Sequence, residues 1–207
     1  MTVTTRRYSP RVPREERREQ ILDAALSLVA DRGFGGVSME AVAREIGIAK
    51  TVVYDAFDNQ PELLRALFER EQQRTLAEVA AAVPKPPLEG DPGEILAESI
   101  STLLGAVREH PDTWRLILLP ADGTPPALQA EVNRHRERLL DQLEPMVAWG
   151  MQRLGLGEVD PELATRMILG SAEDAARLTL THPRRFPPDR IASFVVDLLA
   201  AIQRENV

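Results

Sequence analysis

Residues 38–57 constrain the fold of this chain more than any other segment. Ser38 is a good N-cap for a helix that Gly47 ends after about two turns, and a second short helix is expected over residues 50–57. The apolar stripe of the first helix consists of Met39, Val42, Ala43 and Ile46. Helices this short are unstable in isolation, so the pair requires a third helix to pack against. We therefore predict a helix-turn-helix, in which the first helix braces a second that enters the major groove of DNA.

The remaining sequence alternates long stretches of helical period with short clusters of proline and glycine. No convincing run of strand-like alternation stands between these clusters, and no internal repeat is found. Further helices are expected over residues 13–31, 60–83, 92–109, 111–119, 126–154, 160–181 and 188–204. The sequence thus predicts an all-α fold, with a three-helix helix-turn-helix domain followed by a larger helical domain.

The helix expected over residues 50–57 has one apolar and one polar side when its residues are placed at about 100° intervals. Val53, Ala56 and Phe57 form the apolar arc, which is expected to face the other helices. The polar arc consists of Lys50, Thr51, Tyr54 and Asp55. Val52 falls at the boundary between the two arcs, where its methyl groups would meet either a thymine methyl or solvent.

Composition and motifs exclude several kinds of protein. Because the 207 residues include no cysteine, we expect no disulfide, no thiolate catalysis and no cysteine-bound zinc. The three histidines are scattered, and no phosphate-binding loop or nucleophile elbow occurs, so we expect no enzyme, no cofactor and no metal site. No apolar run is long enough for a signal peptide or a membrane span, which makes a cytoplasmic protein without membrane contact the default expectation.

The net charge of -7 is spread unevenly along the chain. Residues 1–60 hold nine basic and nine acidic side chains, so the whole acidic excess lies in the C-terminal part. Within the first 18 residues only two acids accompany the six arginines, which are Arg6, Arg7, Arg11, Arg14, Arg17 and Arg18. A basic arm over residues 1–13 is therefore either a solvated tail or a segment that seeks DNA phosphates.

A longer pattern surrounds the two short helices and spans residues 17–69. It consists of Ile21, Ala24, Ala25, Gly33, Phe34, Ser38, Val42, Ala43, Ile46, Gly47, Ile48, Lys50, Tyr54, Phe57, Leu63 and Leu64. With this spacing, the segment resembles the DNA-binding domain of TetR-family transcriptional regulators. The resemblance implies a homodimer with a DNA-binding domain over residues 14–60 and a domain over residues 61–207 that binds a small molecule and dimerises.

The resemblance also implies which residues hold double-stranded DNA. The candidates are Ser38, Lys50, Thr51, Val52, Tyr54 and Gln60. Ser38 would cap its helix against a phosphate, Lys50 and Thr51 would reach bases or backbone, and Tyr54 would bind a phosphate. Two positions depart from the family pattern, because Ala56 replaces a common histidine or aromatic residue and Gln60 replaces a common lysine. We therefore expect fewer charged contacts from this domain, and the N-terminal arginines are a hypothetical compensation.

A ligand site is expected in the C-terminal domain on the same analogy. Its predicted residues are Trp114, Leu118, Met146, Trp149, Met167 and Asp174. The first five would form the walls of a mainly apolar cavity, and the carboxylate would meet a polar group of a largely apolar small-molecule effector. Two alternatives remain open: the Met and Trp side chains are ordinary core, and Asp174 forms an ion pair with Arg177 or another basic residue.

Dimerisation is predicted through the helices near residues 160–181 and 188–204. The second helix carries an apolar stripe of Ile191, Phe194, Val195, Leu198, Leu199 and Ile202, and the first combines apolar with small residues. Two such helices from each subunit would form a four-helix interface, unless they only complete an intramolecular core.

Together these features predict a transcriptional regulator, most simply a repressor that a small molecule releases from a near-palindromic operator. The alternative is a helical dimeric small-molecule-binding or structural protein whose specific DNA binding is weakened or lost. Ala56 and Gln60 are the residues that keep this alternative open.

Overall fold

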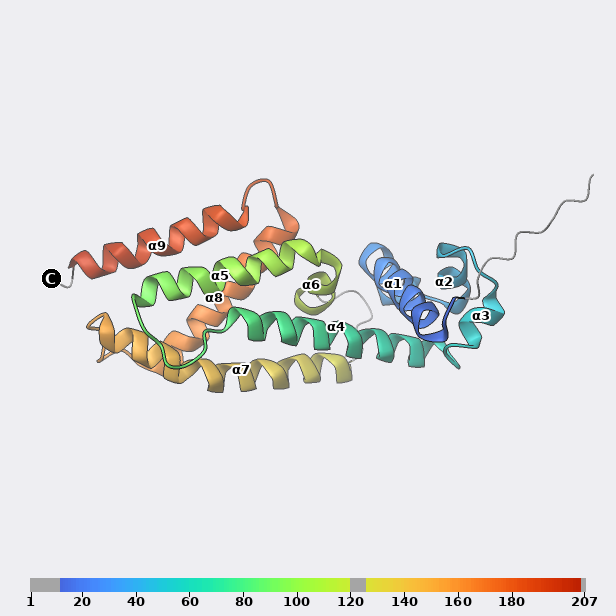
Figure 1. The fold of residues 1–207 in the computed structure, drawn as a ribbon, viewed down its shortest axis with the longest axis horizontal. Helices are drawn as coiled ribbons and strands as arrows, with labels where there is room; N and C mark the ends of the chain where they lie inside the picture. The colour runs from blue at the N-terminus through green and yellow to red at the C-terminus, as the bar shows by residue number, and fades with distance from the viewer. Residues whose placement is uncertain (1–11, 120–125, 206–207) are drawn as a thin grey trace, which may run out of the picture. The chain divides into compact units, whose positions relative to one another are not determined.

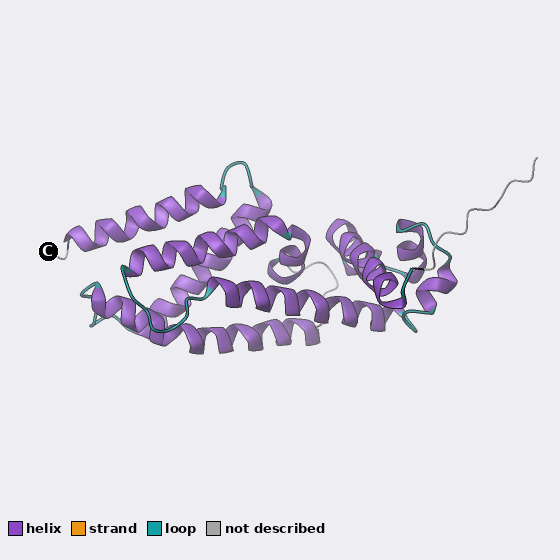
Figure 2. Ribbon diagram, in the orientation of Figure 1, coloured by secondary structure: helices purple, strands orange, loops and turns teal. Residues whose placement is uncertain are grey.

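The structure, a computed structural model, describes residues 12–119 and 126–205, and every element within those ranges is a helix (Figure 1, Figure 2). The elements are α1 (Arg14–Arg32), the 3-10 helix η1 (Phe34–Gly36), α2 (Met39–Glu45), α3 (Lys50–Tyr54), α4 (Gln60–Ala82), α5 (Pro92–Glu109), α6 (Pro111–Leu118), α7 (Pro126–Arg153), α8 (Pro161–Thr181) and α9 (Pro188–Glu205). The predicted all-α class is confirmed. Most of the predicted arm, including Arg6, Arg7 and Arg11, lies outside the described residues.

Local capping chemistry fixes the helix ends around the helix-turn-helix. The Ser38 hydroxyl accepts a hydrogen bond from the Ala41 amide at 3.0 Å, which confirms the predicted N-cap of α2. Before α4, the Asn59 side chain accepts from the Glu62 amide at 2.9 Å, and the Glu62 carboxylate accepts from the Asp58 amide at 2.8 Å. Gly47 follows α2 with a φ of 70°, a left-handed conformation that favours glycine.

The second short helix ends earlier than predicted. α3 stops at Tyr54, and the chain continues as a turn in which the Phe57 amide donates to the Val53 carbonyl at 3.0 Å. The Ala56 carbonyl accepts a hydrogen bond of 2.8 Å from the side chain of Arg18. The Arg18 side chain of α1 therefore satisfies a carbonyl that a further helical turn would have satisfied.

The chain divides into two compact units, Met1–Leu67 and Phe68–Val207, and the division lies inside α4. Leu63 and Leu67 of this helix are completely buried within unit 1. The boundary predicted between residues 60 and 61 coincides with the start of α4, so the helix belongs in part to each unit.

Unit 1 has a small and well-filled apolar core. Its buried side chains come from each of its helices and include Ile21, Ala25, Leu28, Phe34, Met39, Val42, Val53, Phe57, Leu63 and Leu67. Because α2 packs against both α1 and α3, the three helices support one another, as the length of α2 and α3 requires.

Unit 2 is a larger helical assembly built around α5 and α8. α5 packs against α8 and α9, α7 packs against α8, and α6 contacts both α5 and α8 (Figure 1). The buried cluster where α5, α6 and α8 meet consists of Leu104, Val107, Trp114, Ala176 and Leu180. Next to this cluster the helices line a partly open cavity.

Candidate DNA-binding surface and ligand cavity

α3 presents a polar side to solvent and an apolar side to unit 1. Lys50, Thr51 and Tyr54 are exposed, with 42% of the tyrosine accessible, whereas Val53 is 0% and Phe57 is 1% exposed. Val52 is half-buried, in keeping with its predicted place at the boundary. The structure thus confirms which side of the helix faces the core, and the outward residues are a hydroxyl, a phenol and an ammonium group suited to phosphates and base edges.

Lys50 is held by a neighbour from the preceding helix. Its ammonium group forms an ion pair with the carboxylate of Glu40, and it also lies 5.3 Å from the centre of the Tyr54 ring. Hydrogen bonding between the two groups lowers the pKa of Glu40 and raises the pKa of Lys50. Both side chains remain about half exposed, so the pair contributes little to stability.

Arg18 has a role that the sequence did not reveal. Its guanidinium group lies 4.0 Å from the centre of the Phe57 ring and donates to the Ala56 carbonyl at 2.8 Å. Arg18 therefore attaches the end of the α3 segment to α1, and its contact with DNA phosphates remains a prediction. Only a spatial contact across 38 residues identifies this role, because nothing in the local sequence distinguishes Arg18 from Arg17.

Gln60 and Ser38 make contacts within unit 1. The Gln60 side-chain amide donates to the Val37 carbonyl at 2.9 Å and ties the first residue of α4 to the segment before α2. Ser38 uses its hydroxyl oxygen as the α2 cap. Both residues are half-buried, and their contacts with DNA remain predictions.

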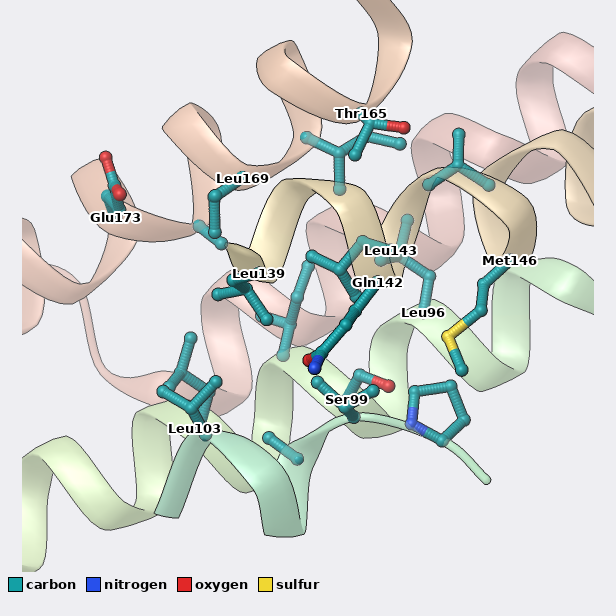
Figure 3. A pocket seen from close by; sticks show the side chains of 18 of the residues that line it. Leu96, Ser99, Leu103, Leu139, Gln142, Leu143, Met146, Thr165, Leu169 and Glu173 are labelled. Carbon is teal, nitrogen blue, oxygen red and sulfur yellow. The ribbon is translucent and has the colours of Figure 1, made fainter. Parts of the chain in front are cut away.

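Unit 2 contains a mainly apolar, partly open cavity of about 1000 Å³, lined by residues of α4 to α9. Figure 3 shows leucines of α5, α7 and α8 around this space, together with Met146 and the polar side chains of Ser99, Gln142 and Thr165. Four of the predicted ligand residues, Trp114, Leu118, Met146 and Trp149, line the cavity. Its volume is at the upper end of the range of about 300 to 1,000 Å³ that is typical for small-molecule sites.

The other two predicted ligand residues lie elsewhere. Met167 is 72% exposed and Asp174 is also exposed, because both occupy the side of α8 opposite to Leu169 and Ala176. This placement corrects their expected position in the cavity. Arg177, one alternative partner expected for Asp174, pairs instead with Glu173 at 3.8 Å.

Charged groups that the sequence did not single out line part of the cavity. Lys85, Arg136 and Arg138 contribute positive charge, whereas Glu173 contributes a carboxylate, which accepts a hydrogen bond of 2.8 Å from Arg136. His135 also lines the cavity, and its ring lies 3.1 Å from the Gln72 amide. The charged lining is therefore positive on balance, and an anionic group of a ligand would be favoured there.

Two further kinds of feature are absent from the described ranges. No helix there is both long enough and apolar enough to cross a bilayer. Within the same ranges, no group of three or more His, Cys, Asp or Glu side chains is arranged to hold a metal ion.

Comparison with known proteins defines the class to which this architecture belongs. Residues 21–67, which contain α2, α3 and most of the unit 1 core, match the family model described as bacterial regulatory proteins, tetR family. A TetR-like transcriptional regulator from Rhodococcus sp. RHA1 shares 27% identity, with a TM-score of 0.72 over 95% of this chain and 98% of its own. Residues 21–67 thus form a TetR-family domain, and the chain as a whole is similar to TetR-family transcriptional regulators.

Two individual relatives are similar along most of the chain. The HTH-type transcriptional activator FasR of Mycolicibacterium smegmatis is 25% identical over 183 residues, which are 88% of this chain and 81% of the relative. The regulator FadR from Bacillus subtilis, solved in complex with stearoyl-CoA, is 22% identical, with a TM-score of 0.63 over 87% of this chain and 96% of its own. The second likeness shows the fold.

Proposed function

We propose that this regulator binds an operator through α3 and that a long, largely aliphatic ligand in the unit 2 cavity controls the affinity for DNA. One observation carries the proposal: the same chain combines an exposed polar arc on a helix-turn-helix with an apolar cavity of about 1000 Å³. The continuous helix α4 has its first turns in unit 1 and its later turns in the cavity wall. A ligand that favours one arrangement of α4 shifts the DNA-binding equilibrium by its differential affinity.

On the DNA side, each predicted residue has a distinct proposed role. Lys50 and Thr51 contact base edges or backbone at the N-terminal end of α3, and Tyr54 donates to a phosphate. Val52 meets a thymine methyl group. Ser38 and Gln60 lie at the N-terminal ends of α2 and α4, where backbone amides favour a phosphate.

The proposed ligand has an aliphatic body and an anionic end. Apolar side chains supply most of the cavity wall, and Lys85, Arg136 and Arg138 supply positive charge. Fatty acyl thioesters of coenzyme A combine both properties, since the acyl chain is apolar and the phosphates are anionic. The FadR relative named above was solved with such a molecule, stearoyl-CoA, which supports this class of ligand.

A homodimer through α8 and α9 completes the proposal. In the described part of one chain these helices expose large apolar side chains, with Met167 72%, Phe194 62% and Leu163 59% accessible. A second copy would bury these surfaces and place two α3 helices on a near-palindromic operator, with half-sites one helical turn or more apart. The protein would act in the cytoplasm, where its DNA is found, and without catalysis.

We propose repression as the sense of regulation, with ligand binding releasing the operator. The FasR relative is named an activator, so the test includes a transcriptional readout. A reporter driven by the upstream region of the protein's own gene is expected to rise when the protein is deleted and to fall when it is restored. A fall on deletion would instead assign activation.

DNA binding and its control by ligand are tested together with purified full-length protein. We expect saturable binding to the upstream fragment, no comparable binding to shuffled DNA of equal length, and weaker binding when stearoyl-CoA is added. Coenzyme A alone is the control, because it has the anionic groups without the acyl chain. Equal, weak binding to both DNAs would support the alternative of a protein that has lost specific DNA binding.

A further inference from the structure

α6 is attached to α4 by two hydrogen-bonded carboxylates. The Thr113 hydroxyl donates to Glu71 at 2.6 Å, and the Trp114 indole N–H donates to Glu78 at 2.7 Å. Glu71 and Glu78 are seven residues apart, so about two turns of α4 separate the attachments. The two donors are adjacent in the first turns of α6.

The two attachments differ in their surroundings. Glu71 is 0% exposed and also pairs with Arg70 at 2.6 Å and with Arg74 at 3.4 Å, so its charge is compensated several times. Thr113 is not among the residues that line the cavity. This attachment is therefore a buried hydrogen bond, and its loss would leave a buried carboxylate oxygen with one donor fewer.

The attachment through Glu78 lies at the cavity. Trp114 is 4% exposed, lines the cavity, and belongs to the buried cluster where α5, α6 and α8 meet. Its ring therefore contacts any occupant, while its N–H is bound to α4. The other Glu78 oxygen lies 2.7 Å from His110 Nδ1, an ion-pair distance without hydrogen-bond geometry. The side chain of Glu78 keeps some contact with solvent, being 15% exposed, so rearrangement there costs less than at Glu71.

We propose that Trp114 and Glu78 are the residues through which cavity occupancy acts on α4. A ligand that displaces the Trp114 ring changes the hydrogen bond to Glu78, and with it the position of the helix that continues into the DNA-binding unit. Thr113 and Glu71 keep α6 attached to α4 during this change. The inference rests on the proposed control of DNA binding by an apolar ligand and adds the positioning residues for that control.

Two substitutions at Glu78 provide a matched test, because Glu78 itself does not line the cavity. Glu78→Gln keeps an oxygen that accepts from Trp114, whereas Glu78→Leu removes it. With the upstream fragment and saturating stearoyl-CoA, the ratio of the DNA Kd values with and without ligand is measured for each variant. We expect Glu78→Leu to lower this ratio at least fivefold and Glu78→Gln to stay within about twofold of the parent, since allosteric couplings are typically about 5- to 150-fold.

Two more variants separate coupling from general loosening. Trp114→Phe keeps a ring in the wall without the N–H, and at saturating ligand it is expected to lose the response as Glu78→Leu does. Thr113→Val removes the other attachment and is expected to lower the Tm while keeping the response. A full response in Glu78→Leu and Trp114→Phe, or an equal loss in Thr113→Val, would overturn the assignment.

A parent protein that does not respond to stearoyl-CoA would contradict the proposed control by this ligand, separately from the role of Trp114 and Glu78. Hydrogen exchange of the ligand-free protein then tests whether the bond between Trp114 and Glu78 positions α4. We expect the amides of residues 75–82 in α4 to exchange faster in Glu78→Leu than in Glu78→Gln. Equal exchange in the two variants would show that the bond does not position α4.

Discussion

α3 and α6 are both too short to be stable in isolation, yet they have different roles in the two units. α3 packs its apolar side completely into the unit 1 core, with Val53 0% exposed, and turns polar groups outward. α6 instead places Trp114 between a buried cluster and a cavity, and fixes the helix through carboxylates of α4. A filled core gives the first helix one position, whereas a cavity allows the second to respond to an occupant.

The strongest test of this contrast is the core side of α3. Phe57→Ala removes a side chain that is 1% exposed and on which Arg18 stacks, so it should destabilise unit 1 by about 3 to 5 kcal/mol. Denaturant unfolding followed by circular dichroism measures the change. The exposed Tyr54→Ala serves as the control, and a loss below about 1 kcal/mol in Phe57→Ala would contradict a tightly filled core.

The outward surfaces of the two units should also behave differently. Unit 2 exposes Met167 and Phe194, so the double substitution to glutamate is expected to weaken self-association on the order of a hundredfold. Sedimentation velocity measures the oligomeric state. Arg184→Glu, at an exposed site between α8 and α9, is the control for added negative charge. Unchanged association of the double variant would show that these helices are not the interface.

A smaller effect is expected where α1 holds the end of the α3 segment. Arg18→Gln removes the contact with the Phe57 ring and weakens the bond to the Ala56 carbonyl, which should cost about 1 to 2 kcal/mol of stability. The matched control is Arg17→Gln, because the Arg17 side chain donates to Gln20 within the same helix. Equal stability of the two variants in thermal unfolding would show that Arg18 stabilises the unit no more than Arg17 does.

The polar side of α3 should affect DNA binding without affecting folding. Lys50→Ala and Thr51→Ala are expected to weaken binding about tenfold and to change preference among operator variants. Tyr54→Phe removes a phosphate donor and should weaken binding to all sequences similarly. Binding to a set of single-base operator variants distinguishes these outcomes, and an altered preference in Tyr54→Phe would assign the phenol to base contacts.

The smallest predicted effect concerns Glu40, which pairs with Lys50 in the free protein. Glu40→Gln removes a negative charge beside the α3 surface, so DNA binding should tighten by about two- to threefold and depend more steeply on salt. Titration of the Lys50 ammonium by NMR should show its pKa returning toward the ordinary value, because the hydrogen bond that Lys50 donates to Glu40 raises it. Weaker binding would instead mean that Glu40 orients Lys50 for DNA.

The DNA-binding unit could be predicted closely because its signals are local. Caps at Ser38 and Asn59, the turn at Gly47 and the period of the apolar residues each act within a few positions of the chain. Two features of this unit could not be predicted from local signals: the early end of α3 and the role of Arg18. Both depend on one bond between residues 38 positions apart.

The sequence by itself determined the helices, the class of fold and the side of α3 that faces outward, because 3.6-residue periodicity and capping are properties of short segments. Only the tertiary structure decided what each apolar face of α8 and α9 covers. Leu169 and Ala176 are buried within the chain, whereas Met167 and Phe194 are exposed, although all four are apolar residues on amphipathic helices. The physical reason is that burial depends on which helices pack against each face, and hydrophobicity carries no information about the partner.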